Sequence, residues 1–288
     1  MTLCIAAVCI EGDDPEKQRI IVCADSRIQT DIASGDIGTK HIGISKSLWG
    51  MYSGDSSEAQ KLAGTCRKTL GQITVDSSDV LFEKLNEASA AHKQRLCEER
   101  ANLKFGISYD RLLTHGRKEL PKDSRLRFFL RLEDLDYQCN LLIAGFVGNS
   151  AVIYSIDDRG EVSVEESWAT IGSGSTIAEG NLFFRQQHEI STVERTLYCM
   201  YESTRLAYEA KAPGVGQTLT FLKLEPNPQG IFGVSRMSAK CLGELSRLYD
   251  QKYGPRTIGD EIDGIDPDSW EDARVPIPPE IGLGAEKD

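Results

Sequence analysis

The sequence lacks any apolar run long enough to cross a membrane, and its N-terminus lacks the basic-then-apolar pattern of a secretory signal. Histidine is scarce: the four histidines lie far apart, and none of the eight cysteines belongs to a C-x-x-C pair. These absences argue against a membrane protein, a zinc site and a disulfide framework. We therefore expect a cytoplasmic chain whose cysteines are buried thiols.

The acidic charge is concentrated near the C-terminus. The net charge is −11, and residues 255–288 hold ten acids but only three bases. A negative surface argues against binding to nucleic acid. The Gly, Pro and Asp content of the same segment is typical of an extended chain that cannot bury enough apolar area to fold alone. We expect one folded domain over residues 1–254 and an acidic tail over 255–288, which is either solvated or docked on a neighbouring subunit.

Strand-like apolar runs and helical periodicity alternate in groups along the chain. The predicted strands cover residues 2–10, 19–24, 42–52, 140–146, 151–156, 161–165, 217–224 and 230–235. The predicted helices run through 59–70, from about 78 through 96, and over about 176–187, 192–210 and 238–252. Strands, two helices, strands, two helices and strands predict an α+β fold with two antiparallel sheets and helices on their outer faces, a four-layer αββα sandwich.

Two of these helices carry more detailed signals. In the first, small and apolar residues recur at i, i+3, i+4, i+7 and i+11, which places them on one face. They are Ala59, Leu62, Ala63, Cys66 and Leu70. The helix over about 192–210 follows the capping-box spacing Ser191-x-x-Glu194. We expect the first face to lie in the core and Ser191 to cap the later helix.

The first residues carry the main chemical signal. Removal of Met1 would leave Thr2 with both a hydroxyl and a free α-amine, at the head of an apolar strand. An α-amine titrates near pH ~8 and can accept the hydroxyl proton without help from a histidine. No propeptide precedes Thr2 in this sequence, so we expect methionine aminopeptidase to expose it. A Met-Thr start is common among chains, so the interpretation needs support from other residues.

Five local motifs, in order, provide that support: the leading Thr2-Leu3 strand, Cys23-Ala24-Asp25-Ser26-Arg27, Lys40, Tyr52-Ser53-Gly54-Asp55, and Ile171-Gly172-Ser173-Gly174-Ser175. With them the chain resembles a proteasome β-type subunit, a divergent bacterial-type member of the N-terminal-nucleophile (Ntn) hydrolases. The resemblance covers residues 2–252. It implies the Ntn-hydrolase fold, which is the αββα sandwich expected above.

The resemblance also implies roles for the residues around Thr2. Lys40 would lie beside the Thr2 hydroxyl, where a cation lowers the cost of forming an alkoxide. Asp25 would keep Lys40 charged and oriented, and Arg27 would brace the turn. Read without the resemblance, an Asp-Ser-Arg turn is a local hydrogen-bonded cap and a loop lysine is solvated.

Four further residues receive roles in the same way. The Gly54 N–H would stabilise the developing oxyanion, and Ser173 would bind near the α-amine. Tyr52 would lie near the floor of the pocket for the residue before the cleaved bond. Glu209 would replace a family aspartate after the fourth helix. The sequence departs from the family at Ala212, near the position of a family serine, and this loss removes one hydrogen bond, worth about 1 kcal/mol, from the amine network.

Two insertions distinguish the chain from a compact family member. The first, Gly12–Gln18, lengthens the opening hairpin. The second, about 100–135, is a basic island in an acidic protein, and we expect a surface helix and loop there. Its basic residues are Arg111, Arg117, Lys118, Lys122, Arg125, Arg127 and Arg131, against Glu119 and Asp123 between positions 111 and 131. The alternative is that the island receives the acidic tail of a neighbour or an acidic partner, with an attraction that falls as salt rises.

Together these features predict an N-terminal-threonine peptidase that needs no metal or organic cofactor. Its expected partners are peptide or unfolded-protein substrates, further copies of itself in a homo-oligomeric ring, and possibly an unfoldase; no nucleic acid or membrane is expected. Two alternatives stay open. The chain is a catalytically silent structural subunit of a proteasome-like assembly, or it is an amidase that uses the same nucleophile on a small molecule.

Overall fold

The computed structural model describes residues 2–12, 14–26, 28–29, 34–35, 40–71, 77–133, 135–226, 233–251 and 270–272. The helices within these ranges are α1 (Ser56–Leu70), α2 (Ser78–Phe105), α3 (Tyr109–Glu119), α4 (Lys122–Glu133), α5 (Ser175–Phe184), α6 (Val193–Glu209) and α7 (Ala239–Asp250). Arg27 and most of the acidic tail lie outside the described residues.

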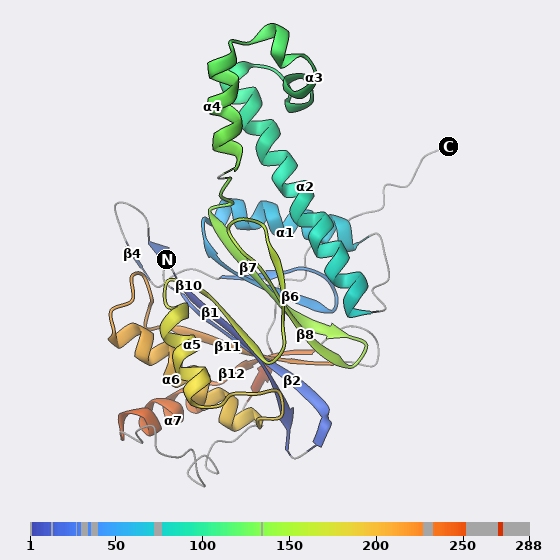
Figure 1. The fold of residues 1–288 in the computed structure, drawn as a ribbon. Coiled ribbons are helices and arrows are strands. Elements are labelled where there is room, and N and C mark those ends of the chain that lie inside the picture. The colour runs from blue at the N-terminus through green and yellow to red at the C-terminus, as the bar shows by residue number, and fades with distance from the viewer. Residues whose placement is uncertain are drawn as a thin grey trace.

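The described strands form two large antiparallel sheets and one short ribbon (Figure 1). The first sheet has the order β10 (Trp168–Gly172), β1 (Leu3–Glu11), β2 (Asp14–Asp25), β11 (Leu219–Glu225), β12 (Gly233–Met237) and β13 (Trp270–Asp272). The second has the order β5 (His41–Gly43), β6 (Leu48–Gly54), β7 (Cys139–Val147), β8 (Ser150–Ile156) and β9 (Val162–Glu165). The ribbon pairs β3 (Ile28–Gln29) with β4 (Ser34–Gly35). These sheets and helices confirm the predicted α+β class.

The apolar sequence of β1 reflects burial on both of its faces. Leu3, Ile5 and Ala7 share a cluster with residues of α5, α6 and α7. Cys4 and Val8, on the opposite face, share a different cluster with residues of the second sheet. Side chains alternate between the two faces of a strand, so a strand buried on both sides needs an unbroken apolar run. The N-terminal strand is therefore held at the centre of the protein.

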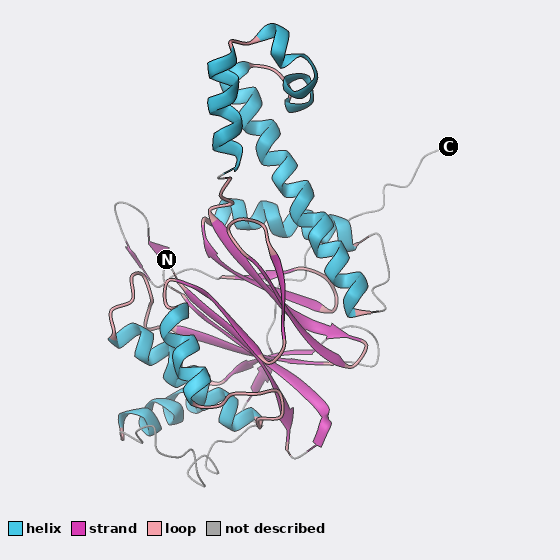
Figure 2. Cartoon of the chain, in the orientation of Figure 1, coloured by secondary structure: helices cyan, strands magenta, loops and turns pink. Residues whose placement is uncertain are grey.

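The helices cover the two sheets separately (Figures 1 and 2). The five residues predicted on the inner face of α1 are its buried residues, and they pack with β6, β7 and β8 and with α2. Helices α5, α6 and α7 pack against the first sheet. All eight cysteines are buried, as the sequence predicted. Within the described part of the chain, no helix combines the length and apolarity that a membrane crossing requires.

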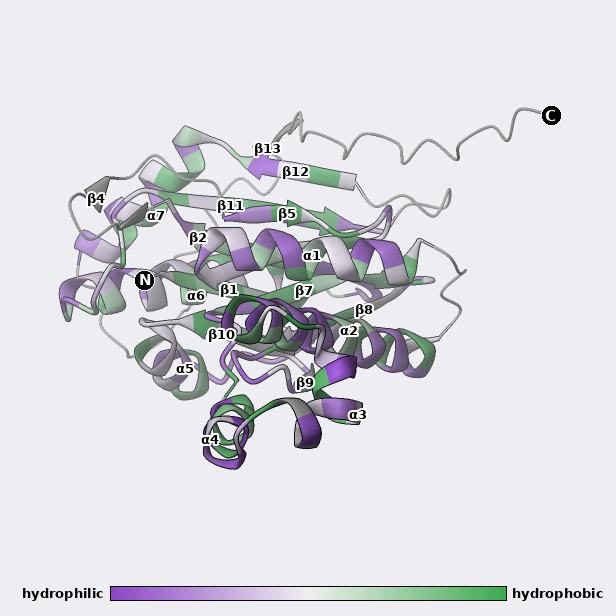
Figure 3. Cartoon of the chain, turned by 90° about the horizontal axis from the view of Figure 1, so that it is seen from above, coloured by the Kyte–Doolittle hydropathy of each residue, from purple (hydrophilic) through white to green (hydrophobic). Residues whose placement is uncertain are grey.

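The predicted basic insertion is an arm of three helical segments (Figure 1). Helix α2 is 28 residues long and extends beyond the sheet, and α3 and α4 pack on its far end. Leu112, Phe128 and Leu132 are buried within the arm. Leu126 and Leu130 are 55% and 50% exposed on α4, where Figure 3 shows apolar and polar positions alternating. The arm is thus more ordered than a surface helix and loop, because it has a small core.

Several elements differ from the sequence-based expectation. Helix α6 is capped by Thr192, whose Oγ1 accepts from the Arg195 N–H, so the predicted cap at Ser191 is wrong. The run over 42–52 is two strands, β5 and β6, separated by a bend over residues 45–47. Strand β10 was not predicted, although it pairs along β1 and leads directly into the Ser173 segment.

Candidate functional site

Thr2 stands at the start of the central strand of the first sheet. The next residue, Leu3, pairs with Gly172 of β10, and Cys4 pairs with Ala24 of β2. Both neighbouring strands therefore end beside Thr2, one with Asp25 and the other with the Ser173 segment. Thr2 is only 1% exposed. The antiparallel register, rather than any local motif, brings these distant segments to one point.

Asp25 connects the groups around Thr2. The Thr2 Oγ1 hydroxyl donates to Asp25 Oδ2 at 2.8 Å, and the Leu3 N–H donates to the same oxygen at 2.6 Å. Lys40 Nζ donates to the other oxygen, Asp25 Oδ1, at 3.0 Å. The side chains of Lys40 and Asp25 are 6% and 0% exposed. A buried charge pair persists only when both charges are compensated, so these contacts depend on one another.

The Ser173 segment closes over the backbone of Thr2. Gly174 N–H donates to the Thr2 carbonyl oxygen at 3.4 Å, and Ser173 Oγ lies 3.5 Å from the same oxygen. Ser173 Oγ also donates to the Pro213 carbonyl, in the loop after α6. Gly172 has φ +105°, and a Cβ there would lie 2.1 Å from the Thr2 carbonyl oxygen. Only glycine permits this close approach.

Gly54 ends β6 on the other side of Thr2. Its φ is +90°, and a Cβ at this position would lie 2.3 Å from the Gln138 carbonyl oxygen. Both the left-handed conformation and the close approach call for glycine here. The following residue, Asp55, caps α1 by accepting from the N–H groups of Ser57 and Glu58. The turn from β6 into α1 is therefore fixed on both sides of Gly54.

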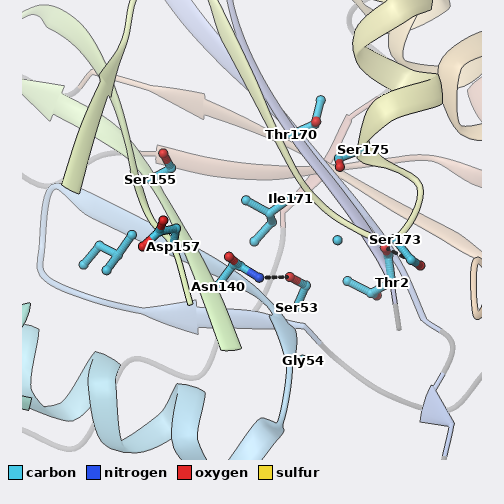
Figure 4. A pocket seen from close by; sticks show the side chains of 12 residues that line it. Thr2, Ser53, Gly54, Asn140, Ser155, Asp157, Thr170, Ile171, Ser173 and Ser175 are labelled. Carbon is cyan, nitrogen blue, oxygen red and sulfur yellow. Dashed lines mark hydrogen bonds between the residues drawn. The ribbon is translucent and has the colours of Figure 1, made fainter. Parts of the chain in front are cut away.

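Thr2 and Gly54 line the same cavity, of about 430 Å³ (Figure 4). Its described lining residues are Thr2, Ser53, Gly54, Asn140, Ser155, Ile156, Asp157, Thr170, Ile171, Gly172, Ser173 and Ser175. The cavity runs between the ends of strands from both sheets, with Thr2 at one end and Ser155 and Asp157 at the other. Most of the lining is hydroxyl, amide or carboxylate. Such a cavity can bind a polar ligand beside the Thr2 hydroxyl.

A neighbouring thiol is chemically quiet. Cys4 is buried, and its Sγ lies 3.4 Å from the Tyr52 carbonyl oxygen. Burial, reinforced by the charge of Asp25, raises the pKa of the Cys4 thiol far above its usual range, with Lys40 opposing the shift. Burial likewise raises the pKa of Cys23 well above that of a free thiol. Since the thiolate is the reactive form, the Thr2 hydroxyl is the stronger candidate for a nucleophile.

Two predicted site residues lie elsewhere. Tyr52 belongs to the cluster that packs under α1, because β6 turns its side chain away from the neighbouring Ser53, and Tyr52 is not among the described lining residues of the cavity. Glu209 accepts from Tyr249 Oη at 2.8 Å and from Arg205 Nη2 at 3.1 Å on the surface. The structure therefore does not join Glu209 to the Thr2 group. The position of Arg27 is outside the described residues.

Several lining residues were not predicted. Asn140 Nδ2 donates to Ser53 Oγ at 3.4 Å across the start of β7. Asp157 was predicted only as part of a hairpin turn, and Thr170 lies on the strand that was missed. No spacing in the sequence relates these positions to Thr2. The one available signal is that each follows or ends a strand that reaches the same edge.

Comparison with known proteins assigns no family: no protein-family model matches this chain, and no curated protein matches it either. Among the residues that the structure describes, no group of three or more His, Cys, Asp or Glu side chains is placed to hold a metal ion. The candidate site therefore rests on its own geometry.

Proposed function

We propose that this protein is an N-terminal-threonine peptidase of the proteasome β type. The observation that carries the proposal is the Thr2 hydroxyl, bound to the buried Asp25–Lys40 pair at the end of a polar cavity. A hydroxyl, a cation and an orienting carboxylate in contact are the usual parts of an activated nucleophile. The sequence motifs around these three residues led to the same proposal independently.

We also propose that the two sheets and their helices form the four-layer αββα sandwich of Ntn hydrolases. Support comes from the shared clusters: Cys4 and Val8 of the first sheet pack with Met51 and Leu142 of the second. Helices pack against each sheet in two further clusters. This arrangement would place the first residue of a central strand at the open ends of both sheets.

The reaction begins once Met1 is removed, because until then the Thr2 nitrogen is an amide and cannot act as a base. Thr2 Oγ attacks the substrate carbonyl carbon, and its proton passes to the α-amine. Lys40, held by Asp25, lowers the cost of negative charge on Oγ. The Gly54 N–H stabilises the tetrahedral oxyanion. The protonated amine then gives its proton to the leaving nitrogen, and water hydrolyses the resulting ester to free Thr2.

Ser173 supports the position of Thr2 in this scheme. It binds the carbonyl of Thr2 and the carbonyl of Pro213, so it fixes the first residue against the loop after α6. That loop lacks a serine at Ala212, and Glu209 points to other partners. We infer that backbone groups here replace side chains that the family uses around the amine.

The natural substrate of such a site would be a peptide or an unfolded protein, in a cytoplasmic homo-oligomeric ring with or without an unfoldase. A second candidate is a small amide, hydrolysed by the same nucleophile. The volume of the cavity, about 430 Å³, favours keeping this candidate, since it falls within the range of small-molecule sites.

Kinetics of two Thr2 variants test the proposal. Thr2→Ser keeps a hydroxyl and an α-amine, so peptide hydrolysis should stay within about tenfold of the natural protein. Thr2→Ala removes only the hydroxyl, and hydrolysis should fall by at least about 10³-fold. Both residues permit removal of Met1, so the two proteins differ in the nucleophile alone. Equal hydrolysis by the Ala variant would exclude Thr2 as the nucleophile.

A further inference from the structure

The end of the cavity opposite Thr2 has a distinct chemical character. Among the described lining residues, Asp157 is the only one with a side-chain charge. It is half-buried, next to Ser155 and Ile156, and the close-up shows its carboxylate on the cavity wall (Figure 4). No lysine, arginine or histidine belongs to the described lining. A negative charge therefore faces the cavity with no cation in its described lining.

Two hydroxyl groups of the lining are committed as donors to carboxylates behind them. Ser155 Oγ donates to Glu165 Oε1 at 2.8 Å, and Thr170 Oγ1 donates to Glu179 Oε1 at 2.7 Å. A hydroxyl has one proton to give, so each oxygen offers only its lone pairs to a ligand. The lining thus presents acceptors at Ser155, Thr170 and Asp157, with two more carboxylates one hydrogen bond away.

We propose that this end of the cavity binds a cationic side chain of the substrate, lysine or arginine. An ammonium or guanidinium group carries several donors and no acceptor, which complements a wall of acceptors around one carboxylate. The inference rests on the proposed function in one respect only: it places the cation on a substrate whose scissile amide lies at Thr2. It thereby specifies a substrate class that the nucleophile alone does not define.

Asp157 also shapes the β8–β9 turn, and this affects how it can be tested. Its Oδ1 accepts from the N–H groups of Arg159 and Glu161, at 2.9 and 2.7 Å. Asparagine retains an Oδ1 acceptor, so Asp157→Asn removes the charge and keeps the turn. Asp158 is the next residue of the same turn, is exposed, and does not line the cavity. Asp158→Asn is therefore the matched control.

The experiment measures peptide binding rather than hydrolysis, so that it does not depend on the nucleophile. Acetyl-Ala-Lys-Ala-amide and its norleucine counterpart, which differ by the ammonium group, are titrated into the Thr2→Ala protein by calorimetry at low salt. We expect the lysine peptide to bind about tenfold more tightly. Asp157→Asn, added to this background, should bring the two affinities within about twofold, and Asp158→Asn should leave the tenfold preference intact.

Three results would overturn the inference: equal affinities for the two peptides, no binding of the lysine peptide at millimolar concentration, or an equal loss with Asp158→Asn. A lysine preference that needs Asp157, in a natural protein that cleaves neither peptide and shows no Thr2 reactivity, would instead leave the cation site standing and reject the peptidase proposal.

Discussion

One carboxylate, that of Asp25, connects three groups at the start of the central strand. It accepts from the Thr2 hydroxyl, the Leu3 N–H and the Lys40 ammonium, and all three contacts are buried. Removing its charge would leave Lys40 without its printed ion-pair partner in a buried site. Loss of one member of a buried pair costs far more than loss of both.

Asp25→Asn should therefore lower the free energy of unfolding by about 3 kcal/mol, and peptide hydrolysis by at least about 10²-fold. Urea unfolding and initial rates measure the two effects. The double variant Asp25→Asn with Lys40→Met removes both charges, so it should regain much of the stability but none of the activity. Full recovery of hydrolysis in the double variant would show that the pair is structural only.

At the scale of single residues, sequence prediction succeeded where a short motif fixes the backbone. Asp25 ends a strand and Lys40 precedes one, and the structure brings both to Thr2. It was weaker where orientation decides. Tyr52 precedes Gly54 by two residues, but strand alternation turns it into the core. Glu209 lies on the last turn of α6, where Arg205 and Tyr249 compete for its carboxylate.

Among the elements, the turn from β6 into α1 carries the most specific constraint. Gly54→Ala would place a Cβ 2.3 Å from a backbone oxygen at a φ of +90°. We expect a loss of at least about 2 kcal/mol in unfolding free energy and a parallel loss of hydrolysis. Thermal unfolding and kinetics of the purified variant provide the measurement.

Gly64 offers a matched control for this substitution. It lies within α1, and a Cβ built there meets nothing within 4 Å. Gly64→Ala should stabilise the protein by about 0.5–1 kcal/mol, since alanine restricts the unfolded chain and favours helix. Similar effects of the two substitutions would mean that the conformation of Gly54 is unimportant.

Elements with strong periodicity were predictable and those defined by pairing were not. The inner face of α1 follows from spacing alone, and its five predicted residues are the buried ones. Strand β10 has no such signal, because Trp168, Thr170 and Gly172 alternate with only two apolar residues. Its position is set by pairing with β1. The arm was read as a loop because its core is supplied by contacts between α2, α3 and α4.

For the molecule as a whole, two buried histidines predict how stability depends on pH. Burial lowers the pKa of His41 from 6.5 to about 4, with Arg236 adding to the shift. Burial also lowers the pKa of His92 to about 4; Arg95 reinforces the shift and Glu58 opposes it. Both rings are neutral in the folded protein near neutral pH. The unfolded chain binds more protons below about 6.5, so acid favours unfolding.

The contribution of these histidines is therefore complete above pH 6.5 and is lost as the pH falls towards about 4, by up to ~1.4 kcal/mol per pH unit for each histidine. Urea midpoints across this range measure it. His92→Phe keeps an aromatic ring against Tyr137 but cannot titrate, so its midpoint should fall less steeply with acid. An unchanged slope would contradict the assignment.

The basic arm predicts salt-dependent self-association. Arg127 and Arg131 lie on α4 beside the exposed Leu126 and Leu130, in a chain with a net charge of −11. If the arm attracts acidic surfaces of neighbouring copies, raising NaCl from 50 to 500 mM, roughly, should shift sedimentation towards smaller species. Arg127→Glu with Arg131→Glu should do the same, about tenfold in dissociation constant.

The control for this charge reversal is Lys46→Glu with Lys68→Glu, at exposed positions outside the arm. It makes the same change in net charge. If it weakens association equally, the effect belongs to total charge and the arm has no special part. Composition could suggest such an attraction, but only the fold showed that the charges sit on a projecting surface.

The central claim is that Thr2, freed of Met1, is a nucleophile, and the most direct test is intact and peptide-level mass spectrometry of the native protein before and after a threonine-directed epoxyketone. This reagent reacts with a hydroxyl and a free α-amine together. We predict a chain that begins at Thr2 and carries the inhibitor on that residue, with labelling lost in Lys40→Ala. A chain that retains Met1, or a free Thr2 that stays unmodified, would contradict the claim and favour a structural subunit.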